Sequence, residues 1–118
     1  MEEMEYTVAF ELISHAGDSK SESMMAIECA REFQFEEAKE HLMKAGEKLT
    51  KAHNSHLNLI QNEAKGEKVK VNIILVHAQD HLSGAILIKD QAEEFINLYQ
   101  MIKEIKEQYV TKKNTNIV

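Results

Sequence analysis

Residues 76–82, Val-His-Ala-Gln-Asp-His-Leu, place two imidazoles and a carboxylate on adjacent turns of a predicted helix. His77 and His81 are four residues apart, so they are neighbours on one helix face, and Asp80 lies one step off that line. Imidazole, with a pKa of ~6.5, is largely neutral at cytoplasmic pH and can act as a nucleophile. Because the pair lies in the apolar run 71–88, the alternative interpretation is two satisfied, partly buried core histidines.

The motif lacks the signatures of two common classes of enzyme. No GxxxxGK[ST] loop occurs in the chain, so it does not bind ATP as a P-loop kinase does. The motif is not HExxH either, because the glutamate that serves zinc hydrolases is missing. His77, His81 and Asp80 leave open a helical metal-dependent hydrolase, and a non-catalytic trimeric helical adaptor is a third possibility.

The composition of the 118 residues predicts one all-α domain, 1–118. Proline is absent and there are only four glycines, which favours helix throughout. The net charge of −6 argues against nucleic-acid partners. The single Cys29 rules out an intramolecular disulfide and is expected as a small core filler in a reducing compartment. No apolar stretch reaches the ~18 residues of a membrane helix and the acidic start is no signal peptide, so a cytoplasmic protein is expected.

Helical periodicity predicts three helices at about 5–31, 34–64 and 73–109, with a frayed tail at 111–118. Gly17 interrupts the first pattern, so either the helix bends there or a neighbouring backbone comes close. Lys65 and Gly66 mark the end of the second helix, residues 67–72 are an extended connector, and Asn72 is the expected N-cap of the third. Short loops predict an antiparallel three-helix bundle.

Two predicted helices carry regular apolar stripes. The second has one, with small residues that allow close packing, at Phe35, Ala38, Leu42, Ala45, Leu49, Ala52, His56 and Leu59. The third has two, of which the second comprises Ile73, Val76, Asp80, Gly84, Leu87, Gln91, Leu98 and Met101. One stripe is enough to pack against two helices of the same chain, so the second predicts contact with further copies of the subunit. Asp80 falls within that interface stripe.

The chain resembles the lactose/cellobiose-specific enzyme IIA of the bacterial sugar phosphotransferase system. The matching segments span most of residues 8–102 and lie at 13–18, 35–38, 52–53, 59–64, 66–67 and, above all, 76–82. Two departures stand out: the family usually has Gly where Phe33 stands, and Met-Thr where Ser83 and Gly84 stand. The first departure leaves the conformation of the turn between the first two helices unpredicted. The second removes no reactive group.

The resemblance implies a cytoplasmic phosphocarrier that forms a homotrimer of three-helix subunits. It implies that His77 accepts a phosphoryl group from phospho-HPr and passes it to a cysteine of enzyme IIB, with the membrane reached only through the enzyme IIC permease. Gln79 and His81 are expected to support His77 by hydrogen bonding. It also implies one magnesium ion per trimer, held on the three-fold axis by Asp80. Ala78, where lactose members have Gly, favours cellobiose or another β-glucoside over the β-galactoside lactose.

Overall fold

The computed structural model describes residues 3–116 and contains three α-helices with no β-strand in that range. Helix α1 spans Glu3–Arg31, α2 spans Phe35–Ala64 and α3 spans Ile73–Asn116. The prediction of an all-helical chain with three helices is therefore confirmed. None of these helices combines the length and the apolar character that crossing a membrane requires.

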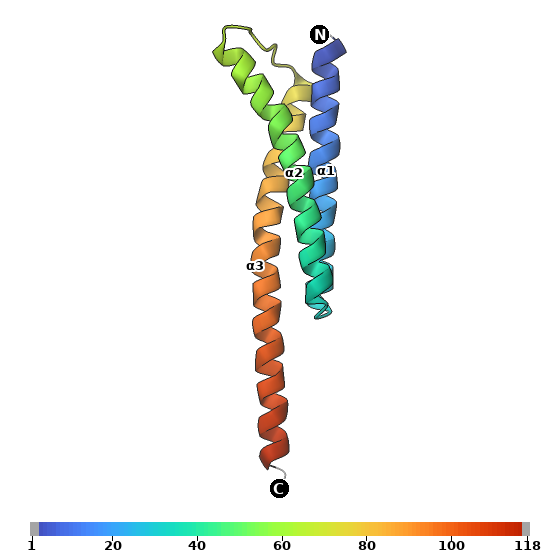
Figure 1. Ribbon diagram of the computed structural model, residues 1–118, viewed down its shortest axis with the longest axis vertical. Helices are drawn as coiled ribbons and strands as arrows, with labels where there is room; N and C mark the ends of the chain where they lie inside the picture. Colours follow the sequence, from blue (N-terminus) through green and yellow to red (C-terminus); the bar gives the residue numbers. More distant parts are fainter. Residues whose placement is uncertain (1–2, 117–118) are drawn as a thin grey trace.

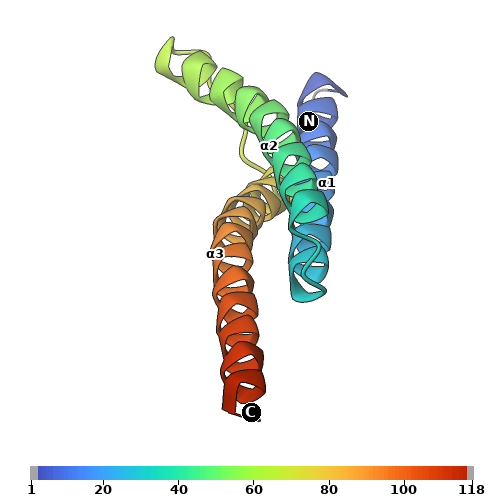
Figure 2. The ribbon, with the colours of Figure 1, turned by 60° about the horizontal axis from the view of Figure 1, so that its bottom comes forward.

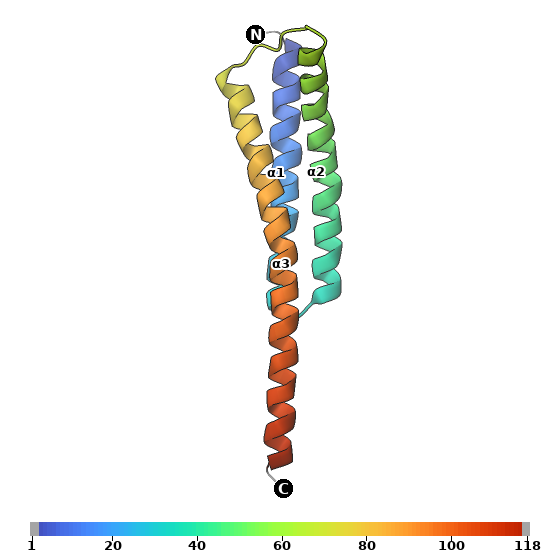
Figure 3. The ribbon, with the colours of Figure 1, turned by 90° about the vertical axis from the view of Figure 1, so that its left-hand side faces the viewer.

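The helices lie side by side and form an elongated molecule of 76 × 21 × 20 Å. Helix α2 runs back along α1, and α3 then follows the direction of α1 and continues well past the α1–α2 turn (Figures 1 and 3). The connector end of α2 leans away from α1 (Figures 1 and 2). Helix α1 packs extensively against both other helices, whereas α2 and α3 contact each other much less.

The core between the helices is built mainly from alanine. Ten alanines are fully or almost fully buried, at positions 9, 16, 26, 30, 38, 45, 52, 78, 85 and 92. Small side chains let helix backbones approach closely, so the core is thin and the larger apolar residues surround it. The predicted α2 stripe faces this core, because Ala38, Ala45 and Ala52 are buried and the other members are half-buried.

The α1–α2 turn has a backbone geometry that glycine usually supplies. Phe33 has φ of 60°, in the left-handed region, and its N–H donates to the Ala30 carbonyl at 3.0 Å. The next N–H, of Gln34, donates to the Cys29 carbonyl at 2.9 Å. This pair of bonds is the Schellman motif, which closes a helix with a left-handed residue. A bulky residue is strained in that conformation, so Phe33 needs compensating contacts.

The α2–α3 connection has the predicted signals at both ends. Gly66 has φ of 88°, and the N–H groups of Gly66 and Glu67 bond back to the last turn of α2. Residues 67–72 have no regular secondary structure, and the Val69 N–H donates to the Glu63 carboxylate at 2.8 Å. The Asn72 side-chain oxygen accepts from the Leu75 N–H at 3.0 Å, which confirms the predicted N-cap.

Two details of the predicted helices are wrong. Helix α1 is unbroken at Gly17, and a methyl group added there would meet no atom outside its own turn of the helix within 4 Å, so no neighbouring backbone approaches closely. Helix α3 does not end near residue 109 but continues to Asn116, where a frayed tail was expected. The chain has no proline and no glycine between 85 and 118, so nothing in the backbone stops this helix earlier.

Candidate functional site

The two motif histidines touch each other on the first half of α3. The Nε2 atoms of His77 and His81 are 3.1 Å apart, within hydrogen-bond distance. Their rings meet edge to face with centroids 4.5 Å apart. His77 is exposed and His81 is half-buried. The alternative of two core histidines therefore does not describe His77, which is open to solvent and to a partner protein.

The helix turn that carries the histidines is fixed by burial on its other side. Ala78 and Leu82, each of which directly follows one of the two histidines, are buried against Ala9, Leu12 and Ala52. Helices α1 and α2 thus hold this turn of α3 from behind, while the imidazoles point away from the core. Because Ala78 and Leu82 are one turn apart, the helix cannot rotate without exposing one of them, and the orientation of His77 is set.

The remaining polar residues of the motif, Gln79 and Asp80, have surroundings that differ from those of the histidine pair. Gln79 is half-buried and lines a cavity of about 550 Å³ with His56, Leu75 and the connector. Asp80 is exposed, and no cation pairs with it among the described side chains. Within the described residues of one chain, no three His, Cys, Asp or Glu side chains form a group that could hold a metal ion. His77, His81 and Asp80 therefore do not make a metal site by themselves.

The predicted interface stripe of α3 is open to solvent in the single chain. Ile73 is 85% exposed, and Val76, Leu87, Leu98 and Met101 are also among the exposed large apolar residues. Gly84 adjoins open space, and Ser83 beside it is exposed, so the departure from Met-Thr changes this outer face alone.

The other histidines have separate environments. His41 contacts Glu22 of α1 at 2.6 Å. His56 is half-buried, and burial, followed by the charge of the nearby His53, lowers its pKa below the ordinary value of 6.5. His15 is half-buried, with Nδ1 lacking a hydrogen-bond partner among the described residues. None of these three makes the direct ring contact that joins His77 and His81.

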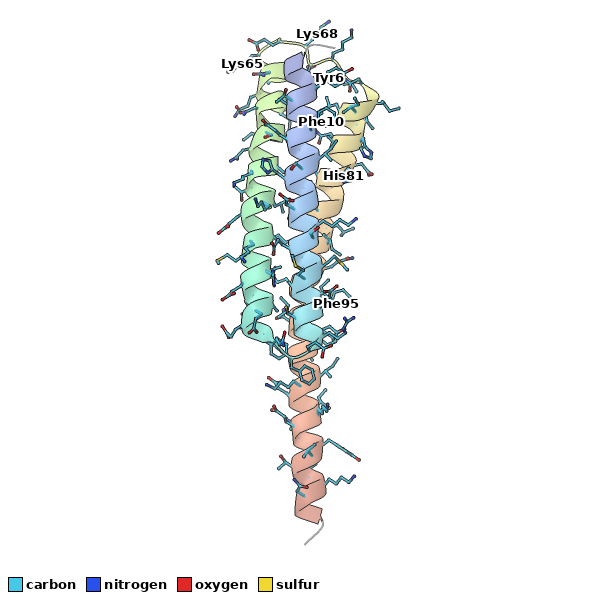
Figure 4. The ribbon with its side chains drawn as sticks, turned by 90° about the vertical axis from the view of Figure 1, so that its right-hand side faces the viewer. Tyr6, Phe10, Lys65, Lys68, His81 and Phe95 are labelled. Carbon is cyan, nitrogen blue, oxygen red and sulfur yellow. The ribbon has the colours of Figure 1, made fainter. Side chains whose placement is uncertain are left out.

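Sequence reasoning did not single out Phe10, which is 58% exposed on α1. Its neighbours Ala9 and Leu12 pack against the helix turn that carries the motif, whereas Phe10 projects from the exposed side of α1. Tyr6, Phe10 and His81 lie in the same half of the molecule (Figure 4). The signal was available, because Phe10 follows Val8 and Ala9 as a third consecutive apolar residue and cannot join the same buried stripe.

The structure is all-helical with an exposed histidine pair on α3, and comparison with known proteins identifies the family. The sequence model described as "PTS system, Lactose/Cellobiose specific IIA subunit" matches residues 7–100. The chain belongs to this family of enzyme IIA components, which are phosphocarriers of the sugar phosphotransferase system.

Three similar proteins illustrate the match. The lichenan-specific phosphotransferase enzyme IIA component of Bacillus subtilis is 48% identical over 103 residues, which cover 87% of this chain and 93% of that protein. The cellobiose-specific enzyme IIA structure from Bacillus anthracis has a TM-score of 0.85 at 39% identity, covering 88% of this chain and 95% of that one. The structure of the Escherichia coli IIA(chitobiose)–HPr complex has a TM-score of 0.74 at 33% identity, and the match covers 87% of this chain and 99% of that one.

Proposed function

We propose that this chain is a cytoplasmic phosphocarrier that accepts a phosphoryl group from phospho-HPr on Nε2 of His77 and passes it to a cysteine of an enzyme IIB. The observation that carries this proposal is the exposed His77 ring, with the Nε2 of His81 only 3.1 Å from its own Nε2. HPr as the donor is supported by the similar Escherichia coli protein, which was solved as a complex with HPr.

The histidine contact suits this transfer chemically. When His81 donates its Nε2 proton, the Nε2 of His77 is the acceptor, and the His77 proton then resides on Nδ1. The Nε2 lone pair of His77 attacks phosphorus as the bond from phosphorus to the donor breaks. The His81 N–H then lies next to the phosphoryl oxygens and stabilises their charge. The buried Ala78 and Leu82 keep this turn of α3 in place during the transfer.

The functional unit is proposed to be a homotrimer. The stripe containing Ile73, Val76, Leu87, Leu98 and Met101 is an apolar face along α3 that one chain leaves in water. Monomeric proteins rarely expose such a continuous apolar surface. Three parallel copies of α3 packed around a common axis bury it, and we call this proposed interface the seam.

The seam also gives Gln79 a role beside His77 of a neighbouring copy. His77 follows the seam residue Val76, whereas Gln79 precedes the seam residue Asp80, so the two lie on opposite flanks of the stripe. Opposite flanks of adjacent helices meet in a parallel coiled coil. Gln79 of one subunit is therefore placed to hydrogen-bond the phosphoryl group on His77 of the next.

Asp80 is proposed to bind one magnesium ion per trimer on the three-fold axis. A single chain provides one exposed carboxylate without a cationic partner among its described residues, which is compatible with three copies sharing an ion. Three carboxylates brought together are stable only with protons or a cation between them, and oxygen ligands suit a hard ion such as Mg²⁺. The ion would neutralise the seam, while the phosphoryl chemistry belongs to the histidines.

The transported sugar is proposed to be a β-glucoside disaccharide of the cellobiose type, taken up and phosphorylated through enzyme IIB and the IIC permease. Ala78 of the motif supports this, as do the similar proteins named for lichenan and cellobiose.

The test is to incubate the purified protein with phospho-HPr and to map the modified residue by mass spectrometry at neutral or alkaline pH, because phosphohistidine is acid-labile. We expect one phosphoryl group per chain, on His77. No acceptance from phospho-HPr, or full modification of a different residue, would contradict the proposal.

A further inference from the structure

The charge of this protein is unevenly distributed along its length. Helix α3 runs to Asn116, past the α1–α2 turn and past residue 100, where the family match ends (Figures 1 and 3). Residues 101–118 contain four lysines and two glutamates, a charge of +2, in a chain whose total charge is −6. Residues 1–100 therefore carry −8, and the projecting end of α3 is basic on an otherwise acidic molecule.

The first two lysines of this segment are attached to their own subunit. The ammonium groups of Lys103 and Lys106 lie 5.8 Å and 5.6 Å from the centres of the Phe35 and Phe33 rings. The Lys103 ammonium is also 3.8 Å from the carboxylate of Glu107. These contacts hold the segment beside the α1–α2 turn and use the charge of both lysines within the subunit.

The last part of α3, residues 108–116, has cations without partners, and we call it the tip. Lys112 and Lys113 are exposed, and neither pairs with an acidic group among the described side chains. The tip contains no Asp or Glu. Tyr109 and Val110 are 65% and 49% exposed. Lysines beside an exposed tyrosine suit the surface of an anionic bilayer, because the ring favours the headgroup region and the ammonium groups are attracted to acidic lipids.

We propose that the tip docks on the anionic lipid headgroups of a membrane surface. A stable protein partner needs a complementary surface of roughly 800 Å² on each side, which the end of one helix about 10–12 Å across does not provide. A lipid surface has no fixed shape to match, so charge and a few apolar atoms are enough. This inference adds a direct membrane contact to the proposed function, which does not require one.

The opposite end of the molecule is less suited to an anionic surface. The connector there also bears exposed lysines, Lys65 and Lys68 among them, but the acidic first turn of α1 lies at the same end (Figures 1 and 4). Docking by the tip also keeps the proposed phosphorylation site free. Lys113 is 36 residues after His77, about 54 Å along the helix, so His77 stays clear of the bilayer and open to HPr.

The proposed homotrimer would strengthen this contact. If its copies lie parallel, all tips point in one direction, and the lysines of each copy meet the same lipid surface. Once one tip is bound, the others are held close to the surface, so the binding of the assembly exceeds that of a single chain. The tip of a single chain is still basic, so the contact does not depend on the trimer.

Vesicle flotation tests the docking directly. Vesicles of phosphatidylglycerol and phosphatidylcholine provide an anionic surface, and vesicles of phosphatidylcholine alone provide a neutral one. We expect the wild type to float with the anionic vesicles at about 0.1 M salt and not with the neutral ones. It should be released at about 1 M salt, where the Debye length falls from about 10 Å to about 3 Å. Absence of binding to the anionic vesicles, or equal binding to both kinds, would overturn the proposal.

Two double variants that remove the same charge show whether the tip is responsible. Lys112→Gln with Lys113→Gln removes two cations from the tip, and Lys44→Gln with Lys51→Gln removes two exposed cations from α2. The tip variant is expected to lose at least tenfold in its partition to anionic vesicles, because each lysine near the surface contributes to binding. The α2 variant should bind as the wild type does. Equal binding of the two variants contradicts a role of the tip.

Two further measurements separate docking from helix stability and from the proposed function. Lysines in the last turn also favour the helix dipole, so Lys112→Arg with Lys113→Arg, which keeps both charges, should restore binding with unchanged circular dichroism. Phosphoryl acceptance from phospho-HPr in solution should be the same in the wild type and all variants. A wild type that accepts phosphate but does not bind anionic vesicles would remove the docking proposal alone.

Discussion

At the scale of residues, the contact between His77 and His81 assigns them different roles. His77 is the exposed ring that a partner can reach, and His81 is half-buried and positioned to donate a hydrogen bond. This asymmetry follows from helix geometry, because four residues turn His81 about 40° from His77. That rotation brings His81 closer to the face that carries the buried Ala78, Leu82 and Ala85.

Removing either ring should therefore have a different effect on phosphoryl acceptance. His77→Ala is expected to abolish it with helical content unchanged, because one exposed side chain is not a folding determinant. His81→Ala should slow it roughly 10- to 100-fold, since a hydrogen bond to a charged group is worth about 1.5–3 kcal/mol. His53→Ala, which removes an exposed histidine from α2, is the control and should react at the wild-type rate. Rates are measured with phospho-HPr, and acceptance by His77→Ala at another residue would contradict the assignment.

His56 is expected to make the stability of the fold depend on pH. Its pKa is lowered in the folded chain by burial and then by His53, so the unfolded chain binds the proton first as the pH falls. Its contribution to stability is thus fully present above an unfolded pKa of ~6.5 and is lost as the pH falls through that value. Urea unfolding at fixed protein concentration measures the free energy of unfolding at about pH 7.5 and about pH 5.5. Between these two pH values, that free energy should fall less in His56→Gln than in wild type.

The control for this measurement is His53→Gln. It removes only the smaller cause of the pKa shift, so it should keep most of the wild-type loss of stability. An identical pH dependence of wild type and His56→Gln would show that His56 does not contribute.

At the scale of elements, the α1–α2 turn combines strain with compensation. The left-handed backbone at Phe33 costs roughly 1–2 kcal/mol for a residue other than glycine. The stacking of Phe33 on Phe35 and the contact of Phe33 with Lys106 each stabilise the turn by about 0.5–1 kcal/mol. These terms are similar in size, which explains how phenylalanine is tolerated where glycine is usual.

Two substitutions separate the strain from the ring contacts. Phe33→Ala keeps the strained backbone and loses the ring, so it should destabilise the fold. Phe33→Gly loses the ring but relieves the strain, and should be about 1 kcal/mol more stable than Phe33→Ala despite the greater freedom of unfolded glycine. Urea unfolding of wild type, Phe33→Ala and Phe33→Gly measures the free energies of unfolding. If Phe33→Ala is as stable as Phe33→Gly or more stable, the backbone at residue 33 is not strained.

At the scale of the whole molecule, substitutions of Asp80 test whether this residue lies on the proposed three-fold axis. Asp80→Leu should strengthen trimer association at least about tenfold, because three desolvated carboxylates are replaced by apolar contacts. Asp80→Lys should dissociate the trimer, because three ammonium groups would meet without a counterion. Asp90→Lys, an exposed position on α3 outside the seam stripe, is the matched control and should assemble normally.

Sedimentation velocity with and without a chelator measures these effects. If association is unchanged in both Asp80 variants and in the presence of chelator, Asp80 does not lie on the three-fold axis and does not bind a magnesium ion there.

The sequence by itself determined the features that depend on local periodicity and local chemistry. Helical spacing defined three helices, Gly66 and Asn72 marked the connector, and the motif at 76–82 with its neighbouring segments indicated the family. These predictions succeed because helix periodicity, capping and a family motif are encoded by residues close together in the chain.

Only the tertiary structure decided which side of each helix meets another. It showed that His77 is open while His81 is half-buried, that Gln79 lies away from both beside the α2–α3 connector, and that Phe10 is exposed on α1. It also showed that Phe33 takes the left-handed place of a glycine and meets Lys106, which is 73 residues further along the chain. Such contacts depend on how alanine-lined helices pack and how far α3 extends, and no local pattern contains that information.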